Sequence, residues 1–238
     1  MNIALLLSGG TGSRMGSDIP KQYIIAGDKR ICAYCMETLF AHPDIDAVQI
    51  VADPEWQKTI VQCGERLSRG LWESKFRGFS LPGENRQLSI FHGLEDVSGY
   101  GEEGAYVLVH DAARPLLSME QISSCLQGAV GHDGAMPVLP MKDTVYYSRD
   151  GQRVEKLLDR STIYAGQAPE VFVLERYYEA NRRLLPDDIL KINGSTEPAI
   201  LAGMDIAMIP GDEGNFKITT KADLERFCKM IAEGEWKR

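Results

Sequence analysis

A glycine-rich segment with two cations is the part of this chain whose residue types are best suited to chemistry. Residues 8–16 read Ser-Gly-Gly-Thr-Gly-Ser-Arg-Met-Gly, so Arg14 lies within the segment, and Lys21 follows five residues after its end. The apolar run at residues 3–7 is typical of a parallel strand that delivers backbone N–H groups and positive charge to a polyphosphate. We therefore expect a nucleoside-triphosphate site along the loop residues Leu7, Ser8, Gly9, Gly10, Thr11 and Gly12.

Two familiar glycine motifs do not fit this loop. A Walker-type P-loop requires Lys and Ser/Thr directly after its last glycine, whereas Gly12 is followed by Ser-Arg. A dinucleotide fingerprint requires G-x-G-x-x-G and an acid about twenty residues later. Here the spacing of the glycines at 10, 12 and 16 is one residue too long, and Asp53 lies too far along the chain to be the required acid. A structural turn without a ligand is the remaining alternative, and the two cations argue against it.

Three further segments place polar side chains at predicted element ends. Asp111 and Arg114 follow the apolar run 106–110. There the carboxylate can hold Mg²⁺ or orient a hydroxyl while the guanidinium binds a phosphate, or the pair can form a salt bridge that locks the loop. Residues 83–89 open a helix, whose N-terminus favours anions and polar base edges. Lys217 is predicted to lie inside an apolar strand at 215–219, where it is costly unless it meets an anion.

Composition limits the classes of protein. With 238 residues, 44% of them hydrophobic, the chain suits one large α/β domain spanning residues 1–238. Its net charge of -8 argues against nonspecific nucleic-acid binding, because a polyanion needs a basic face. No apolar run approaches the roughly 20 residues of a membrane span, and the apolar N-terminus lacks a basic flank. We expect a cytoplasmic protein with neither nucleic-acid nor membrane partners.

Cysteines and histidines do not indicate a metal or redox site. The five cysteines are an odd number, which fits reduced thiols. Cys32 and Cys35 form a C-x-x-C inside an apolar helical pattern, so we expect both to be buried as small hydrophobic side chains. The four histidines show no ligand spacing.

Apolar strands alternate with amphipathic helical segments along most of the chain. This alternation predicts βαβ units and a mostly parallel twisted sheet with helices on both faces. Ser118 with Gln121, and Thr220 with Asp223, predict helix N-termini. The predicted pairs of strand and helix are 47–51 with 54–67, 79–81 with 87–97, and 106–110 with 118–130, followed by a strand at 135–139.

The stretch from about 142 to 164 interrupts this alternation. Residues 144–148 and 153–157, joined by the turn 149–152, predict a β-hairpin with polar alternation. A hairpin that projects from a doubly wound domain can embrace a second subunit, or it can be a solvated surface hairpin. The residues alone leave both interpretations open.

Seven ordered motifs together carry a family resemblance that covers nearly the whole chain. The chain resembles the cytidylyltransferases that act on 2-C-methyl-D-erythritol 4-phosphate in isoprenoid synthesis and on ribitol 5-phosphate in wall-polymer and capsule synthesis. The motifs are residues 9–15 with Pro-Lys-Gln-Tyr at 20–23, Gly83-x-x-Arg86-x-x-Ser89, His-Asp-Ala-Ala-Arg-Pro at 110–115, Lys-Asp-Thr at 142–144, Asp159-Arg160, Gln-Ala-Pro-Glu at 167–170, and Asn-Phe-Lys-Ile-Thr at 215–219.

The resemblance implies a Rossmann-like nucleotidyltransferase fold, CTP as co-substrate, and a homodimer joined through a hairpin arm at about 142–164. It implies that Arg14 and Lys21 stabilise the transition state. By the same comparison the nucleotide is bound by Ser8, Gly9, Gly83, Ser89 and Ala112, with Glu84 and Arg86 in the same loop. The acceptor contacts implied are Asp111, Arg114, Thr144, Arg160 and Lys217, with Thr144 and Arg160 contributed by the partner's arm.

The chemistry of the residues agrees with this class. A phosphate oxygen of the acceptor is already anionic and can attack the α-phosphorus of CTP without a general base, so catalysis is positioning and charge neutralisation. Mg²⁺ is expected as cofactor, bridging triphosphate oxygens, with Asp111 as the candidate ligand. An NAD(P) oxidoreductase, which would need the missing fingerprint, and a noncatalytic nucleotide-binding regulator, which would not need both cations, are the alternatives from other classes.

The motifs divide over the acceptor. Residues 110–115 and 142–144 look like the methylerythritol branch, whereas 9–12, 164–167 and 217–220 look more like the ribitol branch. Residues 193–199 depart from the Thr-Asp-x-Ala pattern of both branches. The sequence slightly favours ribitol 5-phosphate or a similar alditol phosphate as the acceptor, with 2-C-methyl-D-erythritol 4-phosphate as the alternative.

Overall fold

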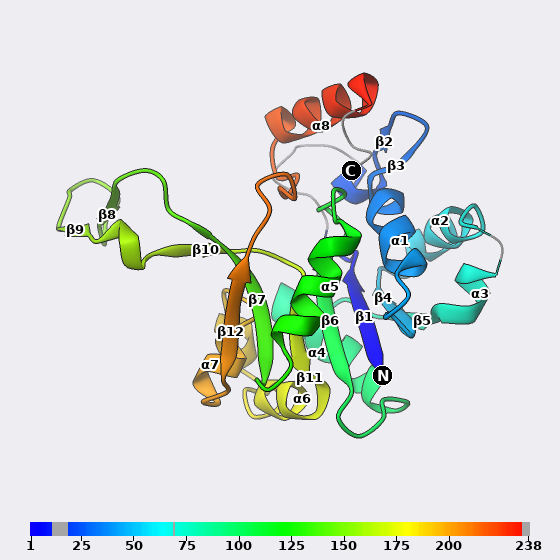
Figure 1. Cartoon of the computed structure of the whole chain (residues 1–238), viewed down its shortest axis with the longest axis horizontal. Helices are drawn as coiled ribbons and strands as arrows, with labels where there is room; N and C mark the ends of the chain where they lie inside the picture. Colours follow the sequence, from blue (N-terminus) through cyan, green and yellow to red (C-terminus); the bar gives the residue numbers. More distant parts are fainter. Residues whose placement is uncertain (11–18, 69, 235–238) are drawn as a thin grey trace.

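The computed structural model describes residues 1–10, 19–68 and 70–234 (Figure 1). Three residues of the predicted phosphate loop, Thr11, Gly12 and Arg14, therefore lie outside the described residues. In the described part of the chain no helix is long and apolar enough to cross a membrane.

An eight-stranded sheet forms the centre of the molecule, in the order β10-β7-β11-β6-β1-β4-β5, with β12 paired to β7. The parallel pairs are β1 with β4 and β6, β4 with β5, and β7 with β12, whereas β10 and β11 run antiparallel to their neighbours. The sheet is thus mostly parallel, as predicted. Its strands are β1 Asn2–Leu7, β4 Ala47–Val51, β5 Phe76–Ser80, β6 Tyr106–Asp111, β7 Gly134–Pro140, β10 Tyr164–Gly166, β11 Glu170–Val173 and β12 Ile206–Pro210.

Helices cover both faces of the sheet because its central strands are apolar on both sides. On one face Ala4 and Leu6 of β1 pack in a core with α1, α2, α3 and α5. On the other face Ile3 and Leu5 pack with α4, α6 and α7. These helices are α1 Ile31–Ala41, α2 Pro54–Gly64, α3 Leu71–Lys75, α4 Arg86–Ser98, α5 Met119–Gly128, α6 Leu174–Arg182 and α7 Glu197–Leu201.

A third, smaller core lies beyond the carboxyl edge of the sheet, under the last helix, α8 Lys221–Glu233 (Figure 1). Phe227 of α8 packs there with Tyr34 and Ile218, next to the short hairpin β2 Ile25–Ala26 and β3 Lys29–Arg30. The predicted cap of α8 is confirmed, because Thr220 and Asp223 form a reciprocal capping box. The predicted cap of α5 is confirmed as well, since the Ser118 side chain accepts from the Gln121 backbone N–H.

The predicted strand at 215–219 is wrong. These residues form an irregular segment between β12 and α8, and the strand of this region is β12, which pairs with β7. Ile218 is fully buried in the core under α8, and its backbone N–H donates to the Ala113 carbonyl at 2.8 Å. The segment is therefore apolar because it packs beside the turn after β6 and under α8, and it is not a strand of the sheet.

The predicted hairpin is confirmed as a separate two-stranded antiparallel sheet, β8 Val145–Tyr147 and β9 Lys156–Leu158. Figure 1 shows it projecting away from the central sheet on the chain that connects β7 to β10. Its second strand begins three residues later than predicted. Several apolar side chains of this arm are exposed, among them Tyr146, Val154 and Leu157. The described residues also form short 3-10 helices: η2 Lys21–Tyr23, η3 Arg160–Thr162 and η4 Asp188–Lys191.

Candidate active site

A cavity of about 350 Å³ opens at the carboxyl ends of β1, β4 and β6, where parallel strands present their loops. It is lined by ten residues that were predicted from the sequence to belong to the site: Leu7, Gly9, Gly10, Lys21, Gly83, Glu84, Arg86, Ser89, Asp111 and Lys217. Five more were not predicted as site residues: Gln22, Val51, Asn85, Ala113 and Thr219.

The helix η2 fastens the start of the glycine loop and places Lys21 beside it. Gln22 Nε2 donates to the carbonyls of Ser8 and Gly10, both at 2.7 Å. Tyr23 Oη donates to the Ser8 carbonyl at 2.7 Å and accepts from Ser8 Oγ at 2.9 Å. Lys21 precedes these anchors directly and lines the cavity. Neither Gln22 nor Tyr23 was predicted to have a role of its own, although both belong to the Pro-Lys-Gln-Tyr motif.

Ser8 and Ala112 are buried and do not line the cavity in the described structure. The Ser8 hydroxyl donates to Tyr23 Oη, and the Ser8 carbonyl accepts from Gln22 and Tyr23. Ser8 directly follows β1, and Ala112 directly follows β6. Their predicted contact with cytidine stays a prediction.

The segment 83–89 is a tight loop that leads into α4. The Asn85 side chain caps α4 by accepting from the Leu88 N–H at 2.8 Å. Ser89 Oγ accepts from the Gly83 N–H at 2.9 Å and donates to the Asn85 carbonyl at 2.8 Å. A Cβ at Gly83 would lie 2.5 Å from the Leu88 side chain, so only glycine fits there. The loop is therefore rigid, and it aims the start of α4 at the cavity.

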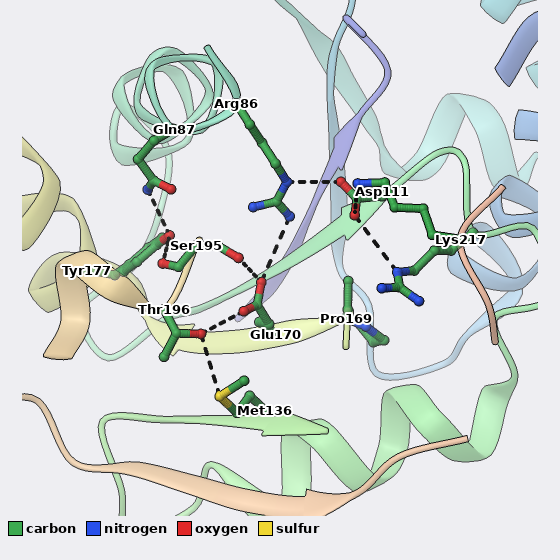
Figure 2. Close-up of polar contacts among 12 residues, drawn as sticks. Arg86, Gln87, Asp111, Met136, Pro169, Glu170, Tyr177, Ser195, Thr196 and Lys217 are labelled. Atoms are coloured by element: carbon green, nitrogen blue, oxygen red, sulfur yellow. Dashed lines mark hydrogen bonds and ion pairs between the residues drawn. The ribbon is translucent and has the colours of Figure 1, made fainter. Parts of the chain in front are cut away.

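Asp111 is the centre of a charged cluster that ends β6 (Figure 2). Its Oδ1 accepts from Arg86 Nε at 3.1 Å, and its Oδ2 accepts from Lys217 Nζ at 2.9 Å. Arg114 Nε lies 3.9 Å from Oδ2, and Arg114 Nη1 donates to the Asn215 carbonyl at 2.7 Å. Burial opposes ionisation of Asp111, but the charges of Arg86 and Lys217 outweigh it and hold the pKa of the carboxyl well below its usual range. Three cations thus surround one carboxylate, which leaves the cluster positive.

Asp111 does not fit the role of a magnesium ligand. Both of its oxygens already accept from cationic side chains, which would repel Mg²⁺. Over residues 1–10, 19–68 and 70–234, no group of three His, Cys, Asp or Glu side chains could hold a metal ion. The described residues of the site are suited to binding anions.

The two arm residues do not reach this cavity within one chain. Thr144 and Arg160 line a separate hollow on the arm together with residues 157–159. Arg160 Nη1 donates to the Lys142 carbonyl at 2.7 Å, and the residue is otherwise exposed. Arg114 also does not line the cavity, because its guanidinium lies behind Asp111, against Asn215. The cysteine expectation is confirmed: Cys32 and Cys35 are fully buried on α1.

Unfolding is expected to become easier as the pH falls from about 6.5 to about 4, because His110 is buried in its neutral form. Its Nε2 donates to the Arg114 carbonyl at 3.0 Å, and burial lowers its pKa from 6.5 to about 4. The unfolded chain takes up the proton first, so this contribution is complete above pH 6.5 and is lost toward pH 4. It amounts to about 3 kcal/mol at most. Burial also lowers the pKa of His42, which acts in the same direction.

Urea unfolding at about pH 7 and about pH 4.5, on the wild type and on His110→Gln, measures this effect. Glutamine keeps a neutral donor for the Arg114 carbonyl, so the variant should lose less stability over this interval. Asp111 does not contribute there, because its depressed pKa matters only below the ordinary carboxyl value of 3.8. An identical pH dependence in the two proteins would contradict the assignment.

The fold and the cavity define a class of protein. The sheet is mostly parallel, and a glycine loop, a lysine and a cationic cluster lie at its carboxyl edge. This combination is typical of α/β enzymes that transfer phosphate-containing groups. The family model of IspD, 2-C-methyl-D-erythritol 4-phosphate cytidylyltransferase, matches residues 2–232. The chain belongs to this family, so the predicted family and the class of CTP-dependent nucleotidyltransferase are confirmed.

Curated relatives support the membership. The chain is 32% identical over 241 residues to the 2-C-methyl-D-erythritol 4-phosphate cytidylyltransferase of Thermotoga neapolitana, covering 100% of this chain and 99% of the relative. It is 31% identical to the chloroplastic enzyme of that name from Oryza sativa subsp. japonica, covering 92% of this chain and 71% of the relative. It is also 31% identical to the bifunctional enzyme IspD/IspF of Rhodospirillum rubrum, covering 98% of this chain but only 58% of that protein.

Solved structures confirm the fold. The 4-diphosphocytidyl-2C-methyl-D-erythritol synthase of Anaerococcus prevotii superposes with a TM-score of 0.82 at 20% identity, covering 97% of this chain and 96% of that chain. The 2-C-methyl-D-erythritol 4-phosphate cytidylyltransferase of Thermus thermophilus gives a TM-score of 0.70 at 23% identity, covering 96% of this chain and 98% of that chain. The predicted Rossmann-like nucleotidyltransferase architecture is therefore the architecture of this chain.

Proposed function

We propose that this chain transfers CMP from CTP to the phosphate of 2-C-methyl-D-erythritol 4-phosphate and releases pyrophosphate. The observation that carries the proposal is the family match over residues 2–232, which includes every described residue of the cationic cavity. The cavity itself supports the chemistry, because it joins a glycine loop and Lys21 to the Asp111 cluster in one space.

The acceptor in this proposal differs from the one that the sequence slightly favoured. Neither the matching family model nor the relatives described above support ribitol 5-phosphate. Their names refer to 2-C-methyl-D-erythritol 4-phosphate or to IspD. The departure at 193–199 is from the pattern of both branches, so it does not separate the two acceptors, and none of these residues lines the cavity. The alternatives of an NAD(P) oxidoreductase and a noncatalytic regulator have no support from the comparisons either.

The mechanism follows from the charges on the cavity wall. The triphosphate lies along the glycine loop, where backbone N–H groups and Lys21 neutralise the charge that develops as the acceptor oxygen attacks the α-phosphorus. Lys217 and Arg86 hold anionic groups, and Asp111 accepts from a hydroxyl of the acceptor. No general base is needed, because the attacking oxygen is ionised. Mg²⁺ stays part of the proposal: bound with the triphosphate, it would neutralise negative charge, and no described residue is assigned to hold it.

CTP is expected to be preferred over ATP by about 100-fold or more in kcat/KM. Loop 83–89 bounds the cavity, and we expect it to accommodate a pyrimidine base and to exclude the larger purine bases. Pyrophosphate release with CTP, UTP, ATP and GTP at subsaturating concentration measures the preference. The same assay with methylerythritol phosphate, ribitol 5-phosphate and glycerol 3-phosphate tests the acceptor. Equal rates with CTP and ATP would refute the nucleotide assignment, and a higher rate with ribitol 5-phosphate would refute the acceptor.

We also infer that the chain forms a homodimer through the arm. The exposed apolar side chains Tyr146, Val154 and Leu157 lie on a hairpin that is detached from the body of the molecule, and burying them requires another surface. A second copy would bring its Thr144 and Arg160 to the cavity, which their own chain does not do.

A further inference from the structure

Arg86 contacts two carboxylates, and only one of them lines the cavity (Figure 2). Its Nε donates to Asp111 Oδ1 at 3.1 Å, and its Nη2 lies 3.9 Å from Oε2 of Glu170. Glu170 is the first residue of β11 and is 6% exposed. The guanidinium therefore connects the acceptor end of the cavity to a buried carboxylate behind it.

Two hydroxyls hold Glu170 in place. Ser195 Oγ donates to Oε2, and Thr196 Oγ1 donates to Oε1 at 2.6 Å. Tyr177 Oη donates to the Ser195 carbonyl at 2.6 Å, so the segment before α7 is itself fixed to α6. Figure 2 shows Ser195 and Thr196 reaching Glu170 from the left of the view, whereas Arg86 reaches it from above.

A buried carboxylate that meets only neutral donors is costly unless a cation completes its shell. Arg86 is the cation that forms an ion pair with Glu170, and Arg114 also attracts this carboxylate. Its planar fork can serve two acceptors at once, so attraction to Glu170 limits the rotamers of Arg86 and turns its Nε toward Asp111. Asp111 Oδ2 is then left to Lys217.

We propose that Glu170 is a positioning residue of this enzyme. Held by Ser195 and Thr196, it orients Arg86 and, through Arg86, the Asp111 carboxylate that receives the acceptor. The segment 193–199 thus influences the acceptor without touching the cavity. This inference rests on the proposed function for its kinetic test, and a spectroscopic test separates the two.

The principal variant is Glu170→Gln, which keeps the shape and removes the charge. Its amide oxygen can take the place of Oε2 and accept from Ser195 Oγ. Its amide nitrogen can donate to Thr196 Oγ1, whose own hydrogen then turns to Met136 Sδ, 3.6 Å away. The fold is therefore expected to persist with a small change in Tm.

The acceptor KM of Glu170→Gln should rise about tenfold. A tenfold change corresponds to the free energy of roughly one hydrogen bond to a charged group. The KM for CTP should change less than threefold. A fall in the acceptor KM would mean that the negative charge of Glu170 only repels the anionic acceptor, and this result would overturn the proposal. A loss of Tm with both KM values unchanged would show a purely structural role and overturn it as well.

Thr196→Val and Ser195→Ala should raise the same acceptor KM by smaller factors and should add nothing in the Glu170→Gln background, because all three act through Arg86. Additive effects would contradict a common route. Glu179→Gln is the matched control: it removes an exposed ion pair with Arg182 on α6 and should leave both KM values unchanged.

The Arg86 Nε–H signal in protein labelled with ¹⁵N-arginine supplies a readout that needs no turnover. We expect a slowly exchanging signal in the wild type that exchanges faster in Glu170→Gln. Unchanged exchange would overturn the positioning role even in an active enzyme. A wild type that is inactive with methylerythritol phosphate but shows the expected exchange would instead refute only the proposed function.

Discussion

Replacing Lys21 by alanine is expected to lower kcat by about 10²-fold or more with the fold intact. Lys21 lines the cavity beside Gly9 and Gly10, where it can neutralise charge that develops on the transferred phosphate. Removing such a group costs about 3 kcal/mol of transition-state stabilisation. The fold should persist because Gln22 and Tyr23, which anchor η2 to the glycine loop, are untouched.

Steady-state kcat from pyrophosphate release, with Tm measured in parallel, tests this expectation. Lys58→Ala is the matched control, since Lys58 is an exposed lysine on α2 away from the cavity lining, and it should turn over like the wild type. Wild-type turnover in a folded Lys21→Ala protein would remove Lys21 from the mechanism. We expect a loss of the same order for Arg14→Ala, at a position outside the described residues.

Local patterns were sufficient to predict most of the fold. The apolar run at 3–7 became β1, whose side chains alternate between two cores. Helix starts were marked by capping residues, whose side chains satisfy N–H groups that the helix itself leaves unpaired. Since capping and periodicity are properties of neighbouring residues, they can be found in the sequence alone.

The failures have a common physical origin in long-range contacts. The segment 215–219 has the apolar residues of a strand, but Ile218 is buried in a core with Ile31 and Tyr34, and its N–H donates to the Ala113 carbonyl. The antiparallel strand β11 lies between β6 and β7, an order that no local pattern specifies.

The candidate site shows the same division. Glycines and cations marked the cavity residues because their types are informative by themselves. The support of the cavity could not be found in this way: Gln22 binds carbonyls 12 and 14 residues away, and Glu170 meets hydroxyls 25 and 26 residues away. Gln22 belongs to the Pro-Lys-Gln-Tyr motif and Glu170 to the Gln-Ala-Pro-Glu motif, so both could be located in the sequence. Their roles became clear only from their contacts in the folded chain.

The Arg160→Ala variant is expected to lose about 10²-fold or more in kcat/KM for the acceptor while CTP binding is nearly retained. Arg160 is an always-charged donor suited to a phosphate, and in its own chain it donates to the Lys142 carbonyl on the arm and lies apart from the cavity. If the arm crosses a two-fold interface, each cavity receives Arg160 from the other subunit. Arg153→Ala, at an exposed position on the same arm, is the control and should keep the wild-type kcat/KM.

Mixing the Arg160→Ala and Lys21→Ala proteins provides the decisive measurement. In a heterodimer, one site combines an intact Lys21 with an intact partner Arg160, and the other site lacks both. Random exchange at equal amounts makes half of the dimers heterodimers, so about a quarter of the wild-type activity should return. Each variant alone retains about 1%. Exchange is verified independently with differently tagged copies. Absence of recovery after verified exchange would show that Arg160 acts within its own chain or has no role in acceptor binding.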